Sequence, residues 1–348
     1  MGLAIALIML AVIAATAWTI TVGATLAAGQ LTAIVAAMLS AIAVTCLTAT
    51  AVVGLDQRSG RFAKTARRIA LRLQLTASAG LQLLALSLAA TILAPLVGTS
   101  TSGATLGDAQ FVALDQRLGF DWIAYLARLN MDAAFGNLLM TVHPFAPVLI
   151  AAPVLLLGLT YQRRRLAEFI CGLTIASFAA LLLFALLPTV GAYLHLRPDA
   201  RLFAHLNPAA GQALAELLNA WSSAVTAVTA EPGTELDPAT LRRIDLLNTS
   251  AALSLPGLQV AAAILVVTSL RRMLLSGVIA AGCCLLIVLS PMSEAGQYLS
   301  QLMFGGLIAV GCILLTQALR YKRQAPPAPV RRHLDRDTDY IAWEKPVR

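Results

Sequence analysis

Residues 251–290 read AALSLPGLQVAAAILVVTSLRRMLLSGVIAAGCCLLIVLS. Two apolar runs, each close to the length of about 20 residues that a helix needs to cross a bilayer, are separated by Arg271 and Arg272. A pair of arginines is strongly disfavoured inside a hydrocarbon core, so the pair marks a turn between two spans. The stretch therefore predicts a helical hairpin in a membrane rather than part of a soluble domain.

The composition extends this prediction to the whole chain. Of its 348 residues, 59% are hydrophobic and only 12% are charged, and the mean hydropathy of +0.79 lies outside the range of soluble globular proteins. Backbone polar groups inside lipid must be paired internally, which favours helices. We expect an all-α, polytopic transmembrane helical bundle of about eight spans, which we place at about 3–28, 31–55, 74–97, 137–160, 166–188, 251–270, 273–290 and 298–320.

The basic residues predict an orientation. Nineteen of the 25 Lys and Arg residues lie at 56–73, 162–165 and 271–272 and in the tail after Leu319. The positive-inside rule then places these segments and both termini in the cytoplasm, and two long loops at about 98–136 and 189–250 outside. The Ala, Leu and Arg content is typical of a bacterium with a GC-rich genome, so we expect an inner-membrane protein. The net charge of +8 is divided among short clusters, which argues against nucleic-acid binding.

We divide the chain into three parts. Residues 1–56 form two N-terminal spans, 57–320 a six-span core, and 321–348 a polar cytoplasmic tail. The apolar start has no Lys or Arg ahead of it and exceeds the usual apolar stretch of a signal peptide, so we interpret it as a retained span. Residues 108–130 and 207–229 have amphipathic patterns, and we predict helices there at the outer interface.

The cysteines point to neither a disulfide framework nor a metal. All five fall inside apolar runs, without CxxC spacing or a nearby histidine cluster. P-loop, GxGxxG and HExxH motifs are also missing from the sequence, so we expect no cofactor.

Three motifs carry a resemblance to a known family. They are LDQRLGFDW at 114–122, RRRLAEF at 163–169 and LPTVGAY at 187–193. In this order, and at these positions in the predicted topology, they resemble the phosphatidic acid phosphatase type 2 (PAP2) superfamily over about residues 75–315. The nearer match is its inositolphosphotransferase-like branch. The resemblance implies a membrane-embedded site that processes lipid phosphates and opens, in this chain, toward the periplasm.

The family's chemistry uses two histidines and an aspartate, in the patterns GHYxxD and SFPSLHA. The corresponding frames here are GQYLSQ at 296–301 and SLPGLQV at 254–260, so Gln297, Gln301 and Gln259 stand at the three catalytic positions. Gly257 replaces the serine after the proline. An amide has no basic ring nitrogen and does not titrate near neutrality, so Gln297 cannot be the nucleophile and Gln259 cannot be the general acid. No catalytic residue is intact at these positions.

Two interpretations of the glutamines stay open. They either form hydrogen bonds between helices or line a polar pocket for a phosphate or sugar head group. Arg242 and Arg243, just before the sixth span, suit phosphate binding through their planar forks, or form a solvated pair. We therefore include these two arginines with Gln259 and Gln297 as predicted substrate-binding residues. None of the histidines at 143, 195, 205 and 333 has an acidic residue at a spacing that marks a catalytic partner.

These observations favour a catalytically degenerate member of the family that binds lipid phosphates. Whether the protein is an enzyme stays open, because an active phosphatase or head-group phosphotransferase using other residues is the alternative. A transporter or scaffold bundle is a third possibility, disfavoured because no charged residue lies in the middle of a span. The expected partners are membrane lipids, including lipid phosphates, and a protein partner of unknown identity, but no nucleic acid.

Overall fold

The computed structural model of the chain is all-α apart from one pair of two-residue strands. It describes residues 5–10, 13, 25–26, 28–56, 60–100, 107–142, 145–187, 189, 192–196, 243–244, 257–293 and 297–324. The first helices in this part of the chain are α2 (Ala28–Asp56), α3 (Arg61–Ser100), α4 (Asp108–Arg117), α5 (Trp122–Met131), α6 (Ala133–Val142) and α7 (Ala146–Leu159). The others are α8 (Arg163–Leu186), α9 (Ala192–Leu196), α13 (Leu258–Leu270), α14 (Leu274–Ser293) and α15 (Leu299–Gln324). The strands β1 (Thr25–Leu26) and β2 (Arg243–Ile244) pair in parallel.

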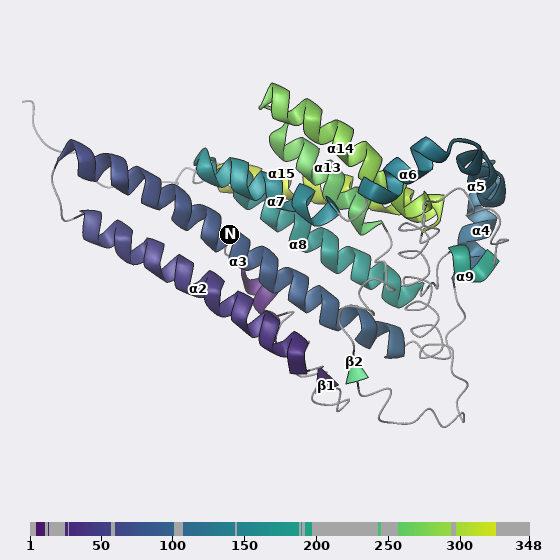
Figure 1. Cartoon of the computed structure of the whole chain (residues 1–348), viewed down its shortest axis with the longest axis horizontal. Helices are drawn as coiled ribbons and strands as arrows, with labels where there is room; N and C mark the ends of the chain where they lie inside the picture. The colour runs from purple at the N-terminus through teal and green to yellow at the C-terminus, as the bar shows by residue number, and fades with distance from the viewer. Residues whose placement is uncertain are drawn as a thin grey trace, which may run out of the picture.

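Helix α8 lies at the centre of the bundle. It packs on α3, α7, α13 and α15, and Figure 1 shows it between α3 and α13. The core has leucine, isoleucine and alanine side chains from all five helices, and Leu166, Ile170, Ala176 and Ala180 of α8 are completely buried. Small residues let neighbouring helices approach closely, which is how helices associate where lipid removes most of the hydrophobic driving force.

Outside the core, large apolar side chains face outward. Leu186 is 69% exposed, Leu307 67% and Val278 66%, on three different helices. Such a surface would aggregate in water, and its natural surroundings are acyl chains. The chain is an integral membrane protein with three helical segments long and apolar enough to span a bilayer, at Phe62–Ala90, Arg163–Leu186 and Leu299–Leu319. Shorter apolar helices lie at Met38–Gly54, Ala146–Leu159, Leu258–Leu270 and Ser276–Ser290, and a total of eight spans stays a prediction.

The arginine pair breaks the chain where the sequence predicts. Helix α13 ends at Leu270, and α14 begins at Leu274 after a turn that contains Arg271 and Arg272. The expected span at 137–160 is instead two helices, α6 and α7. The sequence between them is His143-Pro144, and proline disfavours the helical conformation of the residue before it.

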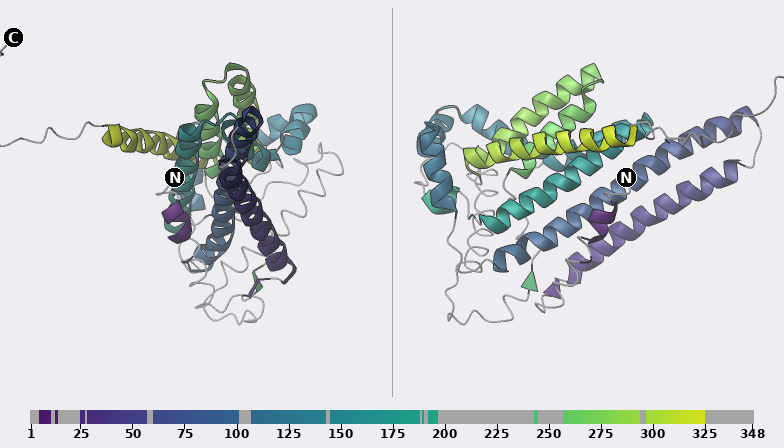
Figure 2. Two further views of the ribbon diagram at one scale, coloured as in Figure 1. Left: turned by 90° about the vertical axis from the view of Figure 1, so that its left-hand side faces the viewer. Right: turned by 180° about the vertical axis from the view of Figure 1, so that it is seen from behind.

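Helices α2 and α3 form an antiparallel hairpin. Figures 1 and 2 show α2 running beside α3, on the side of α3 away from α13 and α14. Helix α3 begins at Arg61, so most of the basic residues that we expect in the 56–73 connection lie on the helix itself. Most of the predicted first span at 3–28, the predicted helix at 207–229 and the tail from residue 325 lie outside the described residues.

The amphipathic segment 108–130 is helical, as predicted, but it forms two helices. Helix α4 ends at Arg117, and Gly119 has a positive φ of 75° that favours glycine. The Asp121 side chain then caps α5 by accepting hydrogen bonds from the backbone N–H groups of Ile123 and Ala124. This break lets α4 lie against the start of α15 at one end of the bundle, as Figure 1 shows.

Candidate functional site

A carboxylate from α4 caps the N-terminus of α15. Asp115 accepts hydrogen bonds from the backbone N–H groups of Leu299 at 3.1 Å and Ser300 at 2.8 Å. The first N–H groups of a helix have no partner within it and carry the positive end of its dipole, so they bind a negative group well. Asp115 is 3% exposed, which strengthens these bonds relative to those of a solvated carboxylate. The position where α15 would attract an anion is therefore already occupied.

Tyr298 joins α4 to the residue before α15 through a second buried carboxylate. Its hydroxyl donates a hydrogen bond to Asp108 Oδ1 at 2.8 Å, and its ring stacks on Phe111 with the centroids 5.8 Å apart. Tyr298 is 1% exposed and Asp108 is fully buried. Burial first, and then the charge of Asp108, raise the pKa of Tyr298 well above its usual value near 10. The phenol is therefore a neutral donor at physiological pH.

Gln301 connects two segments, the start of α15 and the connection after α8, through its amide. Its Oε1 accepts a hydrogen bond from the backbone N–H of Tyr298 at 3.1 Å, and its Nε2 donates to Thr189 Oγ1 at 3.0 Å. Thr189 follows the C-terminus of α8. The Gln301 side chain therefore holds the segment after α8 against the first turn of α15. These are the contacts of an amide that cross-links helix ends, and they match the first of the two interpretations left open for the glutamines.

Glycines bring the start of α13 against α15. Gly257 has a φ of 72°, and a side-chain Cβ there would lie 2.5 Å from the backbone oxygen of Gln301 and from backbone atoms of Gly305. A Cβ on Gly305 would in turn meet the carbonyl oxygen of Gly257. Glycine at 257 thus has a local reason, because only glycine fits both the conformation and the space.

The other two glutamines lie at the same end of the bundle. Gln259 is in the first turn of α13, half-buried, and its Oε1 forms no hydrogen bond with any part of the chain that the structure describes. Gln297 precedes Tyr298 and is 2% exposed. The structure therefore places Gln259, Gln297 and Gln301 where α13 and α15 begin, and Gln301 contacts the connection that follows α8.

The two predicted arginines are not part of this arrangement in the described residues. Arg242 lies outside them, as do three of the four histidines. The backbone of Arg243 belongs to β2 and pairs with Thr25 of β1, beside the start of α2 in Figure 1, and its side chain lies outside the described residues. His195 lies on α9 and is exposed.

A cavity of about 340 Å³ lies between α4, α5 and Tyr298. Its aromatic wall includes Trp122, whose indole N–H is buried and has no hydrogen-bond partner in the described part of the chain. Asp115 and Asp121 contribute carboxylates to the lining. The cavity can take an apolar or hydrogen-bonding group, but its carboxylates do not favour an anion beside them.

Sequence reasoning missed Asp108 and Asp115, the two residues with the clearest structural role at this end. Asp115 belongs to the LDQRLGFDW motif, and both acids sit in a segment whose apolar residues have helical spacing. An acid on the apolar side of such a helix predicts a buried partner, which is the signal that could have found them. Among the described residues, no group of three His, Cys, Asp or Glu side chains is placed to hold a metal ion.

Comparison with known proteins gives one match. The family model described as "PAP2 superfamily" matches residues 109–315, which include α4 to α9 and α13 to the middle of α15. No curated protein and no solved structure matches the chain. The matched segment exceeds half of the chain, so the protein belongs to the PAP2 superfamily.

Proposed function

We propose that this protein is a catalytically degenerate member of its superfamily, of the inositolphosphotransferase-like branch, that binds a lipid phosphate without transferring the phosphoryl group. Members of the superfamily generally act on lipid phosphates. The observation that carries the proposal is the set of amides at 259, 297 and 301, and above all the engagement of Gln301 with Tyr298 and Thr189. An aspartate in that position would orient a nucleophilic imidazole, whereas this amide holds two chain segments together.

The chemistry of amides supports loss of turnover. A nucleophile for phosphorus needs a lone pair that a neighbouring group can activate, and an amide nitrogen gives its lone pair to the carbonyl. A general acid must change its protonation state near the working pH, which glutamine does not do. Neither half of the family's reaction therefore has its group at the three positions that we align with the family's catalytic residues.

Gln259 supports retained binding. A buried carbonyl oxygen without a hydrogen bond is unfavourable by roughly 1–3 kcal/mol, so a donor from a ligand would be stabilising there. The hydroxyls of a glycerol, sugar or inositol head group are such donors. Because Asp115 occupies the N-terminus of α15, the phosphate itself would need cationic side chains, and Arg242 and Arg243 remain our proposal for that role.

The first test measures turnover. Purified protein is given phosphatidic acid, an isoprenyl phosphate and a phosphoinositide, and both phosphate release and head-group exchange are recorded. We expect no turnover above background. Turnover that Gln297→Ala abolishes would contradict the proposal.

The second test restores the family residues. The triple variant Gln259→His, Gln297→His and Gln301→Asp should gain phosphatase activity if the frames are aligned as proposed. Gly257 must be kept, because a serine side chain there would meet the backbone of α15. A variant that melts like the parent and stays inactive would refute the alignment.

The third test measures binding of the same lipids to the unmodified protein. Gln259→Leu should weaken binding by about tenfold, the equivalent of one hydrogen bond of about 1.4 kcal/mol. Gln82→Leu is the matched control, because Gln82 Oε1 is also buried without a partner among the described residues but lies on α3. Equal losses in both variants would argue against a ligand at Gln259.

A further inference from the structure

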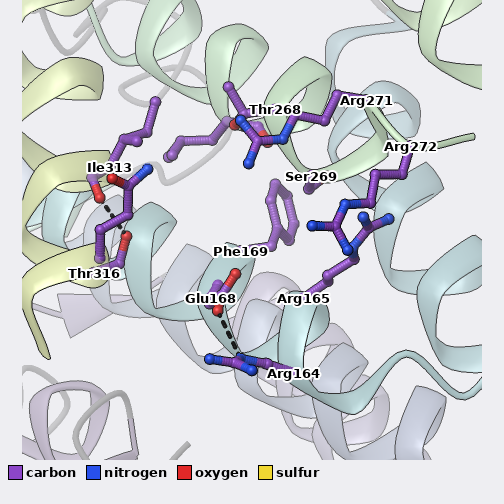
Figure 3. A pocket seen from close by; sticks show the side chains of 12 residues that line it. Arg164, Arg165, Glu168, Phe169, Thr268, Ser269, Arg271, Arg272, Ile313 and Thr316 are labelled. Carbon is purple, nitrogen blue, oxygen red and sulfur yellow. Dashed lines mark hydrogen bonds and ion pairs between the residues drawn. The ribbon is translucent and has the colours of Figure 1, made fainter. Parts of the chain in front are cut away.

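A second cavity lies at the opposite end of α8, α13 and α15. Figure 3 shows it between the first turns of α8, the last turns of α13 with the following turn, and the C-terminal half of α15. The path along α15 from Gln301 to Thr316 is roughly 22 Å at about 1.5 Å per residue, so this cavity is well separated from the glutamines. Its volume is about 150 Å³, far more than the roughly 10–15 Å³ that one water molecule needs.

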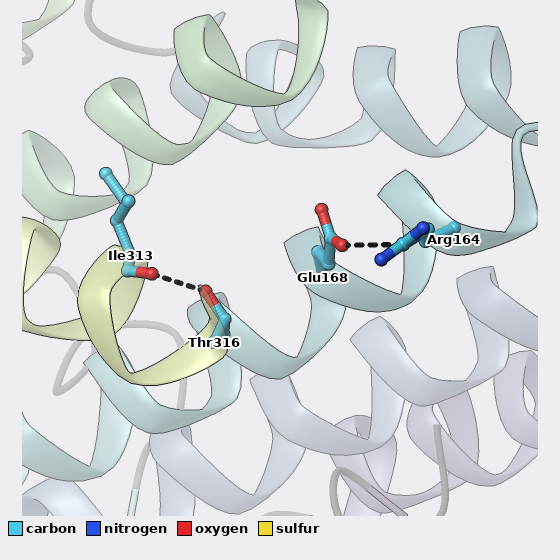
Figure 4. Close-up of polar contacts among 4 residues, drawn as sticks. All are labelled: Arg164, Glu168, Ile313 and Thr316. Carbon is cyan, nitrogen blue, oxygen red and sulfur yellow. Dashed lines mark hydrogen bonds and ion pairs between the residues drawn. The ribbon is translucent and has the colours of Figure 1, made fainter. Parts of the chain in front are cut away.

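The lining of this cavity has a surplus of positive charge. Four arginines, at 164, 165, 271 and 272, line the cavity together with a single carboxylate, that of Glu168. Figure 4 shows Glu168 with Arg164, whose Nε lies 3.4 Å from Glu168 Oε1. Among the residues that the structure describes, no carboxylate forms an ion pair with Arg165, Arg271 or Arg272. An anion would relieve this imbalance.

The arginines come from different elements and converge. Arg165 lies on α8, whereas Arg271 and Arg272 lie in the turn after α13, and their charges repel that of Arg165. In Figure 3 the side chains of Arg165 and Arg272 extend from their two elements toward each other. Planar guanidinium forks donate two parallel hydrogen bonds to one phosphate or carboxylate.

Three hydroxyl groups in the lining already have backbone partners. The hydroxyls of Thr268 and Ser269 donate to backbone oxygens of their own helix, at 3.0 and 2.8 Å. Thr316 likewise donates to Ile313, as Figure 4 shows. Phe169, which is 2% exposed, contributes an apolar side together with Leu265 and Ile313. The cavity thus offers charged donors next to apolar surface, the combination that a phosphate attached to an acyl-chain lipid requires.

The ordinary explanation for arginines between spans is topology. Such charges need only stay on one side of the membrane, as Lys64 and Arg68 do on the exposed surface of α3. Topology does not require them to converge on one hollow between packed helices. Basic pockets between transmembrane helices on the cytoplasmic side are a recurrent form of lipid head-group recognition.

We propose that this cavity binds an anionic phosphate group, carried by a phospholipid head group or free in solution. The site shares no residue with the glutamine site, so it does not depend on the function proposed above. By the positive-inside rule it faces the cytoplasm.

The experiment titrates three probes into the purified full-length chain in detergent. They are phosphatidylglycerol, inorganic phosphate and diacylglycerol, and binding is measured by calorimetry. The double variant Arg271→Gln with Arg272→Gln should weaken binding of the phosphate probe by at least about tenfold. Arg165→Gln, which leaves the turn unchanged, should weaken it in the same direction. A lipid source is indicated if phosphatidylglycerol binds and inorganic phosphate does not, and a free source by the reverse.

The matched control is Lys64→Gln with Arg68→Gln, which removes the same charge outside the cavity. The proposal is overturned if this control weakens binding as much as the cavity variant, because the effect is then one of net charge. It is also overturned if neither phosphate probe binds the parent protein, or if phosphatidylglycerol binds and diacylglycerol binds equally well. Melting temperatures of all variants verify folding, and an Arg165→Gln protein that melts like the parent and keeps full affinity would equally contradict the site.

Discussion

The two ends of the α8, α13 and α15 bundle use polar side chains in opposite ways. The glutamine end, defined by Asp108, Asp115, Tyr298 and Gln301, has buried groups that pair with one another and with helix termini. The arginine end, defined by Arg164, Arg165, Arg271 and Arg272, has partly exposed charges of one sign around a cavity. Groups that pair internally fix a structure, whereas a surplus of one charge stays available for a ligand.

This difference bears on the proposal that the glutamine end is a family site without its catalytic groups. The catalytic side chains of an active site gain and lose protons, so their hydrogen bonds cannot all be satisfied in every protonation state. Amides have one protonation state over the whole physiological range, and Gln301 uses both ends of its amide for structural contacts. The polar groups of the glutamine end thus stabilise the helix ends, as the proposed loss of catalysis there would allow.

The largest effect should come from filling the contact between α13 and α15. Gly305→Ala places a methyl group against the carbonyl oxygen of Gly257, and neither backbone can move without separating the helices. We expect destabilisation by about 3 kcal/mol or more, measured as unfolding in detergent.

Gly306→Ala is the control, because a Cβ at Gly306 meets nothing within 4 Å. It should be neutral or stabilising by up to about 1 kcal/mol, since alanine favours helix more than glycine does. Similar losses in the two variants would mean that the close contact does not hold the glutamine end together.

Removal of the cap on α15 should have the next largest effect. Asp115→Ala leaves one buried and one half-buried N–H group without this partner and loses two hydrogen bonds to a charged acceptor, so we expect a loss of about 3 kcal/mol. Asp121→Ala removes the exposed cap of α5 and should have a loss of only about 1 kcal/mol. If the two variants lose equal stability, burial does not strengthen the hydrogen bonds of Asp115.

Much of the fold follows from the sequence, and the reasons for the exceptions are physical. Arg271 and Arg272 identify the α13–α14 turn because charge is disfavoured in lipid, and the helical spacing of 108–130 predicts α4 and α5 apart from their break. The family motifs locate Gln259, Gln297 and Gln301 at one end of the bundle. Hydropathy, however, does not indicate where a long helix starts, so it places the basic residues of α3 in a connection.

The partners of the site residues could not be predicted. Asp115 lies 184 positions before Leu299, and pairing across that distance depends on how the helices pack. The contact of Gly257 with Gly305 likewise depends on a crossing of two helices rather than on either local sequence. The arginine cavity has the same origin, because its charges come from elements more than a hundred positions apart.

A smaller effect should separate the amides of the two ends. Gln301→Leu removes the acceptor for the N–H of Tyr298 and the donor to Thr189, and we expect a loss of about 1–2 kcal/mol. Gln317→Leu makes the same change on an exposed position of α15 at the arginine end, where we expect a change within about 0.5 kcal/mol. Thermal unfolding of both variants compares their losses of stability. Equal losses would mean that polar side chains at the glutamine end are no more tightly paired than those at the arginine end.

The smallest effect should appear at alkaline pH. Because burial raises the pKa of Tyr298 above its usual value near 10, the folded protein keeps a proton that the unfolded chain releases. The contribution of the phenol to stability is therefore complete below about pH 10 and decreases as the pH rises above it, by about 0.8 kcal/mol at pH 10.5. Tyr298→Phe cannot titrate, so the stability difference between parent and variant should narrow from pH 9 to 10.5. A constant difference over that range would mean that the hydroxyl of Tyr298 is open to solvent. The glutamine end would then not be a buried, internally paired site.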